Sequence, residues 1–244
     1  MSGHNKWSKI KNKKGAADSK RAKEFTKLAR AITVASKEGG ENPDYNASLK
    51  QAIDKAKAIN MPNDNIMRAI KKGSSSSSDE SYETVVYEGY GPSGIAVIVE
   101  CLTDNRNRTA PEVRHAFDKF GGNMGTTGSV SFMFNRRGVI VLDIQGLDAE
   151  EVTMDVLDFE VEDLDVQNDT LEVQTAVENF MEVKNGLEAK GYKFIAFDLM
   201  YIPTNYQEVT DEKDVTNLEK MIDALEDNDD VQNVYHNWDN DDEE

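Results

Sequence analysis

The chain has 244 residues, of which 38% are hydrophobic and 30% are charged, and its formal net charge at pH 7 is −18. A membrane helix needs about 20 consecutive apolar residues, whereas the longest purely apolar run covers residues 95–99, so no membrane span is predicted. The single cysteine, Cys101, excludes an internal disulfide, and the polar N-terminus does not resemble a secretory signal. We therefore expect a cytoplasmic protein.

The charge is divided unevenly along the chain. Residues 1–73 contain 17 Lys and Arg against 7 Asp and Glu, a net charge of +10, whereas residues 74–244 have a net charge of −28. Such asymmetry indicates two separate roles, one of which is contact with a polyanion. The alternative is that the two segments neutralise each other within the folded protein.

The first segment, residues 1–73, is predicted to be a basic domain in which three helices follow an arm, residues 3–17, that has no helical or strand periodicity. The apolar spacing predicts helices over residues 18–38, 43–60 and 63–72. Amphipathic helices of this size can form a small bundle. On the first helix, several cations lie about 170° from the apolar stripe at 100° per residue, so this helix has one basic and one apolar face.

A serine-rich linker is predicted over residues 74–81, where the charge changes sign and five serines follow one another. Beyond it the periodicity becomes that of strands. Residues 82–90 and 94–102 are expected to form a hairpin. A helix should then begin at the capping box Thr109-Ala110-Pro111-Glu112. The remaining predicted elements are strands 130–134 and 139–143, helix 148–159, strands 161–166 and 170–175, helix 176–190, strand 193–201, helix 212–226 and strand 231–236.

The order of these elements predicts an α+β fold with one domain inserted in another. Residues 136–203 contain the succession β-α-β-β-α-β, which is the order of a ferredoxin-like unit. The elements on either side, in residues 82–135 and 204–238, would form a second α+β domain around it. Residues 239–244 are predicted to be an acidic tail.

The basic arm and the first helix are the main candidate site. Cations recur beside a tryptophan, a combination that suits phosphate contacts and base stacking. Lysine dominates, and because lysine is a point charge we expect contacts with backbone and shape more than with sequence. The alternative is a solvated face, with Trp7 packed on the helices. The candidate nucleic-acid-binding residues are Lys6, Trp7, Lys9, Lys11, Lys13, Lys14, Lys20, Arg21, Lys23, Lys27 and Arg30.

Two further stretches are candidates for phosphate or partner contact. Arg106 and Arg108 lie between a predicted strand and a helix N-terminus, where they could hold a phosphate or pair with nearby acids. The glycine-rich loop 121–129 lacks the Lys-Ser/Thr of a phosphate-binding loop and the G-x-G-x-x-G pattern, so nucleotide hydrolysis is not expected. It is either a partner-contacting loop or simple turn chemistry. Its candidate residues are Asn123, Met124, Gly125 and Thr126.

No catalytic or metal site is predicted. His4, His115 and His236 lack the spacing of metal ligands, and Cys101 lies in an apolar strand, where it is expected to be a small core residue. We therefore expect neither an enzyme nor a cofactor, a small-molecule substrate or a membrane partner. The expected partner is a nucleic acid.

Several long motifs resemble one known family. The stretches GHNKWSKIKNKK, AINMPNDNI, YEGYGPSG, CLTDNRNRT and GGNMGTTGSVSFMF occur in this order and resemble the signature of the YebC/PmpR family. The resemblance implies an N-terminal helical domain followed by two α+β domains, one inserted in the other. It also implies a cytoplasmic, DNA-binding transcriptional regulator. Because the family includes a mitochondrial translational activator and is linked to ribosomes stalled on proline-rich peptides, promoter DNA and ribosomal RNA both stay open as partners.

Overall fold

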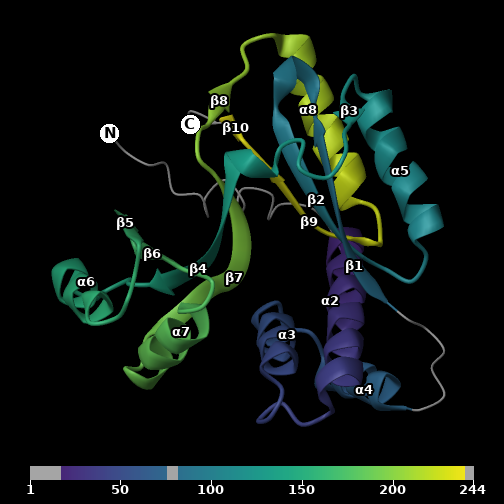
Figure 1. Cartoon of the computed structure of the whole chain (residues 1–244). Coiled ribbons are helices and arrows are strands. Elements are labelled where there is room, and N and C mark those ends of the chain that lie inside the picture. The colour runs from purple at the N-terminus through teal and green to yellow at the C-terminus, as the bar shows by residue number, and fades with distance from the viewer. Residues whose placement is uncertain (1–17, 76–81, 240–244) are drawn as a thin grey trace. The chain divides into compact units, whose positions relative to one another are not determined.

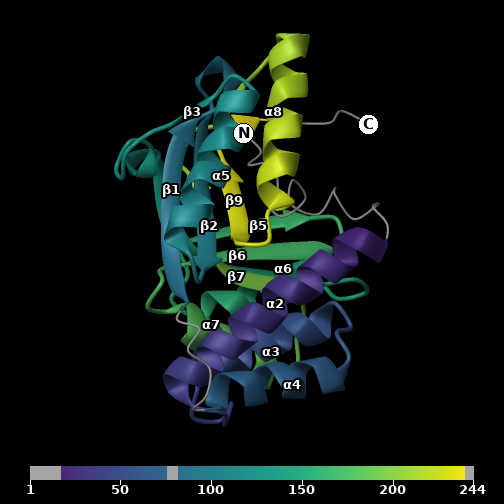
Figure 2. The same cartoon turned by 90° about the vertical axis from the view of Figure 1, so that its right-hand side faces the viewer.

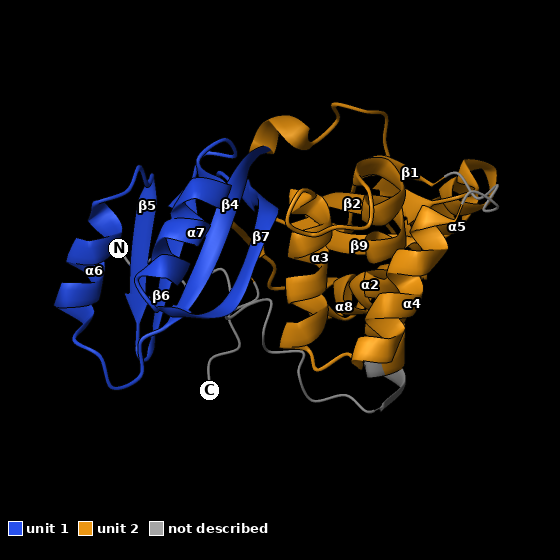
Figure 3. Cartoon of the chain, turned by 90° about the horizontal axis from the view of Figure 1, so that it is seen from below, with its two compact units in different colours: residues 1–15, 134–204, 240–244 blue, residues 16–133, 205–239 orange. Residues whose placement is uncertain are grey.

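The structure is a computed structural model that describes residues 18–75 and 82–239, with side chains from residue 22 onward. Figure 1 shows the order of its helices and strands. Residues 134–204 form one compact unit, called here the smaller unit, and the other described residues form the larger unit (Figure 3). Each unit has its own hydrophobic core. Among the described helices, none combines the length and the apolar character that crossing a membrane requires.

The larger unit begins with three helices, α2 (Asp18–Gly39), α3 (Ala47–Ala58) and α4 (Asn63–Ser74), which Figure 2 shows packed together. Ile32, Leu49 and Ile66 are among the buried residues of their shared core. Helix α3 begins four residues later than predicted because Asn46 caps it, its side-chain oxygen accepting a hydrogen bond from the N–H of Leu49 at 3.0 Å.

Close packing of α4 on α2 requires a glycine near the end of α4. A Cβ atom at Gly73 would overlap the backbone carbonyl of Thr33 in α2. The hydroxyl of Thr33 also donates to the carbonyl of Ala69 at 3.1 Å, and the hydroxyl of Ser36 donates to that of Ile70 at 2.9 Å. The two helices are therefore held together by hydrogen bonds as well as by apolar contacts.

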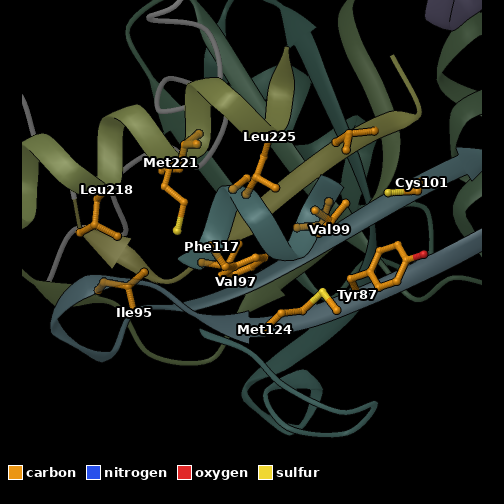
Figure 4. Close-up of a cluster of buried hydrophobic side chains, with 14 of the residues drawn as sticks. Tyr87, Ile95, Val97, Val99, Cys101, Phe117, Met124, Leu218, Met221 and Leu225 are labelled. Atoms are coloured by element: carbon orange, nitrogen blue, oxygen red, sulfur yellow. The ribbon is translucent and has the colours of Figure 1, made fainter. Parts of the chain in front are cut away.

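The rest of the larger unit is a four-stranded antiparallel sheet with the strand order β3-β1-β2-β9. Helices α5 (Arg106–Lys119) and α8 (Glu212–Glu226) contribute to one core with this sheet, which Figure 4 shows in close-up. Phe117 of α5 and Leu218 of α8 are fully buried there. The strands are β1 (Glu83–Tyr90), β2 (Ala96–Thr103), β3 (Asn123–Met124) and β9 (Val231–His236), and a parallel pair is formed by β8 (Gln207–Glu208) and β10 (Trp238–Asp239).

Helix α5 differs from its prediction. It begins at Arg106 with Asn105 as its N-cap, so the capping box expected at Thr109 is wrong. The Asn105 side chain accepts a hydrogen bond from the N–H of Arg108 at 3.1 Å. This bond caps the first turn, so the helix begins three residues before Thr109. Pro111 therefore lies inside the helix instead of in its first turn.

The smaller unit has the predicted ferredoxin-like fold. Its sheet has the order β5-β6-β4-β7, and every neighbouring pair is antiparallel. The side chains of Ile140 and Leu142 share a core with both helices, whereas Val139 and Val141 face the opposite side of the sheet, so both helices cover one face. The elements are β4 (Phe134–Asp143), α6 (Ala149–Leu157), β5 (Asp163–Gln167), β6 (Thr170–Thr175), α7 (Phe180–Ala189) and β7 (Lys193–Pro203).

One strand of this unit was predicted wrongly as two. Residues 134–143 form the single strand β4, whose pairing with β7 continues through Arg136 and Arg137. Gly138, between the two predicted strands, lies inside β4 and pairs with Leu199. It packs so closely on Thr175 and Phe180 that a Cβ atom there would overlap their side chains. The residues just before β4 form a short 3-10 helix, Ser131–Met133, instead of a strand.

Candidate nucleic-acid interface

The structure describes only part of the predicted basic surface. Six of the candidate residues lie outside the described residues, and for two more the side chains do. The six are Lys6, Trp7, Lys9, Lys11, Lys13 and Lys14, and the two are Lys20 and Arg21. Lys23, Lys27 and Arg30 of α2 are described, and all three contact the turn between α8 and β9, residues 226–230, which we call the acidic turn.

The two lysines meet the acidic turn where helix α8 ends. Lys27 Nζ donates to the backbone carbonyl of Glu226 at 2.7 Å, which places a cation at the negative end of the α8 dipole. Burial lowers the pKa of Lys27, although nearby acids oppose this shift. Lys23 Nζ lies 3.0 Å from Asp227 Oδ1, but these side chains are 41% and 59% exposed, so their ion pair contributes little to stability.

Asp230 is the centre of the contact. Its side chain is 4% exposed, and one carboxylate oxygen accepts from Arg30 Nη1 at 2.6 Å. The other accepts from Arg108 Nη2 and from the hydroxyl of Thr109, each at 2.6 Å, and from that of Thr103 at 3.2 Å. Burial alone would raise the pKa of Asp230, but the hydrogen bonds from Thr109, Arg108 and Arg30 outweigh it and lower the pKa to about 2.

Arg30 is held at several points besides Asp230. Its guanidinium donates to the backbone carbonyls of Leu102 at 2.9 Å and Asp229 at 3.0 Å, and it lies over the ring of Tyr82 at 5.4 Å from the ring centroid. The side chain of Arg30 is 17% exposed. Lys27 and Arg30 therefore fasten α2 to the acidic turn, and the internal neutralisation considered from the charge pattern does occur at these positions.

Arg106 and Arg108, the two arginines at the start of α5, have different surroundings. Arg108 pairs with Asp104 at 2.9 Å as well as with Asp230, so pairing with nearby acids is the arrangement that the structure shows for it. Arg106 lies at the first position of α5 and is exposed. Of the two, Arg106 has the side chain that a phosphate could approach without displacing an ion pair.

A second buried carboxylate organises the glycine-rich loop. Glu88 of β1 is 4% exposed and accepts hydrogen bonds from the backbone N–H groups of Gly128, Val130 and Ser131, each at 2.8 Å. Burial alone would raise the pKa of Glu88, but these three bonds outweigh it and lower the pKa. One side chain therefore fixes the end of the loop through three backbone hydrogen bonds.

The candidate residues of this loop are divided between surface and core. Asn123 and Thr126 are exposed, whereas Gly125 is half-buried and lies against Ser129. Met124 is buried and belongs to the core of the larger unit, because Asn123 and Met124 form the strand β3 paired with β1. Of the four candidate residues, Asn123 and Thr126 therefore lie on the surface that this loop offers to a partner.

Sequence reasoning missed the buried carboxylates of Glu88 and Asp230. Glu88 interrupts an otherwise apolar and glycine-containing strand, which is a signal that could have been noticed. Asp230 is one of several acids in the acidic turn, and nothing in the local sequence distinguishes it from Asp227 or Asp229. Asp230 differs from these neighbours in its burial and in its hydrogen bonds from α2, β2 and α5.

The structure shows where Cys101 lies and whether the described residues include a cluster that could hold a metal ion. Cys101 is fully buried, and burial raises the pKa of its thiol to about 12, so it is protonated at neutral pH and belongs to the core. Within residues 18–75 and 82–239, no group of three or more His, Cys, Asp or Glu side chains is arranged to hold a metal ion.

Comparison with known proteins identifies the family. A family model described as the TACO1/YebC protein N-terminal domain matches residues 5–76, and one described as the TACO1/YebC second and third domain matches residues 82–238. The chain belongs to the TACO1/YebC family. This confirms the resemblance seen in the sequence motifs.

Relatives of this family member cover nearly its whole length. A protein of Finegoldia magna is 62% identical over 240 residues, which are 98% of this chain and 100% of the relative. One of Acetivibrio thermocellus is 51% identical over 239 residues, 98% of this chain and 99% of the relative. Both are named probable transcriptional regulatory proteins. A crystal structure of the conserved hypothetical protein Aq1575 from Aquifex aeolicus, 41% identical, superimposes with a TM-score of 0.85 over 96% of both chains. The predicted α+β fold is thereby confirmed.

Proposed function

We propose that this TACO1/YebC family member is a cytoplasmic, nucleic-acid-binding regulator of gene expression that acts through its basic N-terminal segment. The observation that carries the proposal is the net charge of +10 over residues 1–73 in a chain whose remainder has a net charge of −28. A polyanion is attracted to the first segment and repelled by the second. The names of the relatives, probable transcriptional regulatory proteins, support a role in gene expression.

Within this segment we assign the phosphate contacts to the arm and to the start of α2. The arm carries Lys9, Lys11 and Lys13 among its cations, and Lys23 in α2 is partly exposed. Lys27 and Arg30 are assigned to fastening α2 instead, because a phosphate could reach them only by displacing the acidic turn. The proposed phosphate-binding face of α2 therefore excludes Lys27 and Arg30, which the helical spacing had included.

DNA is the polymer that the relatives' names favour, and ribosomal RNA is the second candidate. The acidic remainder of the chain supports the second: 39 acids against 11 bases suit contact with basic proteins such as those of the ribosome. On that account the chain would be a ribosome-associated translation factor that relieves stalled synthesis. A preponderance of lysine over arginine fits either polymer, since both are bound through phosphates.

The deciding experiment compares promoter-fragment binding with ribosome co-sedimentation, both at physiological salt. Replacing Lys9, Lys11 and Lys13 by Gln should weaken binding to the true target. It should also lower the log–log salt slope by about 0.9 per lost contact with duplex phosphate, or about 0.7 with a single strand. The matched control replaces Lys193, Lys213 and Lys220, three exposed lysines of the acidic remainder, by Gln.

The two variants distinguish the possible outcomes. If the arm variant and the control bind both targets as the unmodified chain does, the proposal is wrong. Specific promoter binding without co-sedimentation would reject the ribosomal candidate. Co-sedimentation that depends on the arm, with only nonspecific DNA binding, would reject the transcriptional one.

A further inference from the structure

A groove of about 480 Å³ opens between α2 and α4 in the larger unit. It lies beside the fastening contact of α2, and its size falls within the usual range of about 300–1,000 Å³ for small-molecule sites. Neither the arm nor the predicted basic face of α2 led us to expect it. Its most informative lining residues are Phe25, Arg30, Asn65, Arg68, Lys72 and Tyr82.

The wall formed by α4 is cationic. Asn65, Arg68 and Lys72 are spaced three and four residues apart, so they follow one another along one face of the helix. Arg68 and Lys72 are exposed, and Asn65 is half-buried. Among the described residues that line the groove, none is acidic. An anion at the α4 wall would therefore meet two cationic side chains and one amide.

The opposite side of the groove is aromatic and rigid. Phe25 and Tyr82 are both half-buried and line it. The Tyr82 ring is packed under Arg30, which is itself held by Asp230 and by two backbone carbonyls. Ala29 and Ala69 add small apolar side chains to the lining. A flat ring could enter between such walls with little rearrangement, because the side chains that would contact it are already fixed.

We infer that this groove binds one unpaired nucleotide of a single-stranded nucleic acid, with the base against the aromatic side and its two flanking phosphates on Arg68 and Lys72. Base stacking on aromatic side chains and phosphate contact with cations are the two components of single-strand binding. The Asn65 amide, which can both donate and accept, would face the edge of the base. This inference rests on the proposed function, since it adds a subsite to the same basic segment.

The first test removes the cations of the α4 wall. An eight-residue fluorescent oligonucleotide, as DNA or as RNA, is titrated with the full chain carrying Arg68→Gln and Lys72→Gln, over a range of salt concentrations. A loss of two single-strand phosphate contacts should lower the salt slope by about 1.4 and the affinity by about tenfold or more. The matched control is Lys50→Gln with Lys57→Gln, two exposed lysines of α3 outside the groove.

The second test fills the groove without changing charge. Thr26 is exposed at its lining, so Thr26→Trp should leave the melting temperature unchanged while the indole occupies the space of the base. Affinity for the single strand should fall by about tenfold, the effect of one lost stacking contact. Affinity for a duplex of the same sequence should stay the same, because a paired base cannot enter the groove.

Three results would overturn the inference while the proposed function stands. The first is equal slopes for the α4-wall variant and its α3 control. The second is unchanged single-strand affinity in Thr26→Trp. The third is competition by polyglutamate as strong as by the unlabelled oligonucleotide, which would indicate a general anion surface. If the unmodified chain binds no nucleic acid at physiological salt, the proposed function itself fails.

Discussion

Helices α2 and α4 lie side by side in the same basic segment, but their cations have different surroundings. On α2, Lys27 and Arg30 contact the acidic turn and are largely withdrawn from solvent. On α4, Arg68 and Lys72 are exposed along a groove whose described lining contains no acid. The same residue types therefore hold the fold together in one helix and, on our account, bind a partner in the other. Positive charge in a sequence does not by itself distinguish the two roles.

The largest effect is expected from removing the acid that fastens α2. Asp230→Ala would leave Arg30 partly buried without its carboxylate and would remove one of the two carboxylates that pair with Arg108, so the free energy of unfolding should fall by about 3–5 kcal/mol. Urea denaturation measures this change. The control is Asp227→Ala, which removes only the exposed pair with Lys23 and should cost less than about 1 kcal/mol. Equal losses in the free energy of unfolding for the two variants would show that the buried contact of Asp230 stabilises the fold no more than the exposed pair of Asp227.

A somewhat smaller loss of stability is expected when the pH is lowered. The folded-state pKa of Asp230, about 2, lies below the usual value of about 3.9 in an unfolded chain, so its contribution is complete above about pH 4 and is lost as pH falls through 2. The difference corresponds to about 2.5 kcal/mol. Between pH 5.5 and 2, the unmodified chain should lose about that much more stability than Asp230→Asn. Parallel pH profiles for the two proteins would show that Asp230 is not strongly stabilised in its charged form.

The smallest of these effects is expected at Glu88, whose carboxylate accepts from three backbone N–H groups. Glu88→Gln keeps the shape of the side chain but turns an amide N–H₂ toward the loop, so at least one of the three backbone N–H bonds is lost, at a cost of about 2 kcal/mol. Hydrogen exchange should accelerate at Gly128, Val130 and Ser131 and stay unchanged in α2. Faster exchange in α2 would mean that Glu88 and Asp230 do not act independently.

Much of this fold follows from local sequence patterns. Helix α8 and strand β9 have the predicted bounds, because α8 has a regular apolar stripe and an aspartate N-cap, and β9 has valines and a tyrosine after a polar turn. The ferredoxin-like order was predicted from the succession of elements, although β4 was divided at Gly138. The two-residue strands β3, β8 and β10 were not predicted, since two residues carry no periodicity.

The candidate site was harder to predict than the fold. The helical spacing correctly separated the cations of α2 from its apolar stripe, but it says nothing about what lies against the polar face. The partner of Arg30, Asp230, is 200 residues away in the chain, and only the tertiary structure brings the two together. The groove was missed for the same reason, since its walls come from α2 and α4, from Met61 between α3 and α4, and from Tyr82 just before β1.

Two charge-matched double variants of the full chain would separate the role of the α2 cations from that of the α4 cations, through their stability and their salt-dependent binding. Lys27→Gln with Arg30→Gln should lower the free energy of unfolding by several kcal/mol. Because Arg30 also lines the groove and packs on Tyr82, oligonucleotide affinity should fall, but the salt slope, which counts phosphate contacts, should stay unchanged wherever the protein is folded. Arg68→Gln with Lys72→Gln should leave the free energy of unfolding within about 0.5 kcal/mol and lower the salt slope by about 1.4. The opposite pattern, with the α2 variant losing salt slope and the α4 variant losing stability, would contradict the division of roles between the two helices.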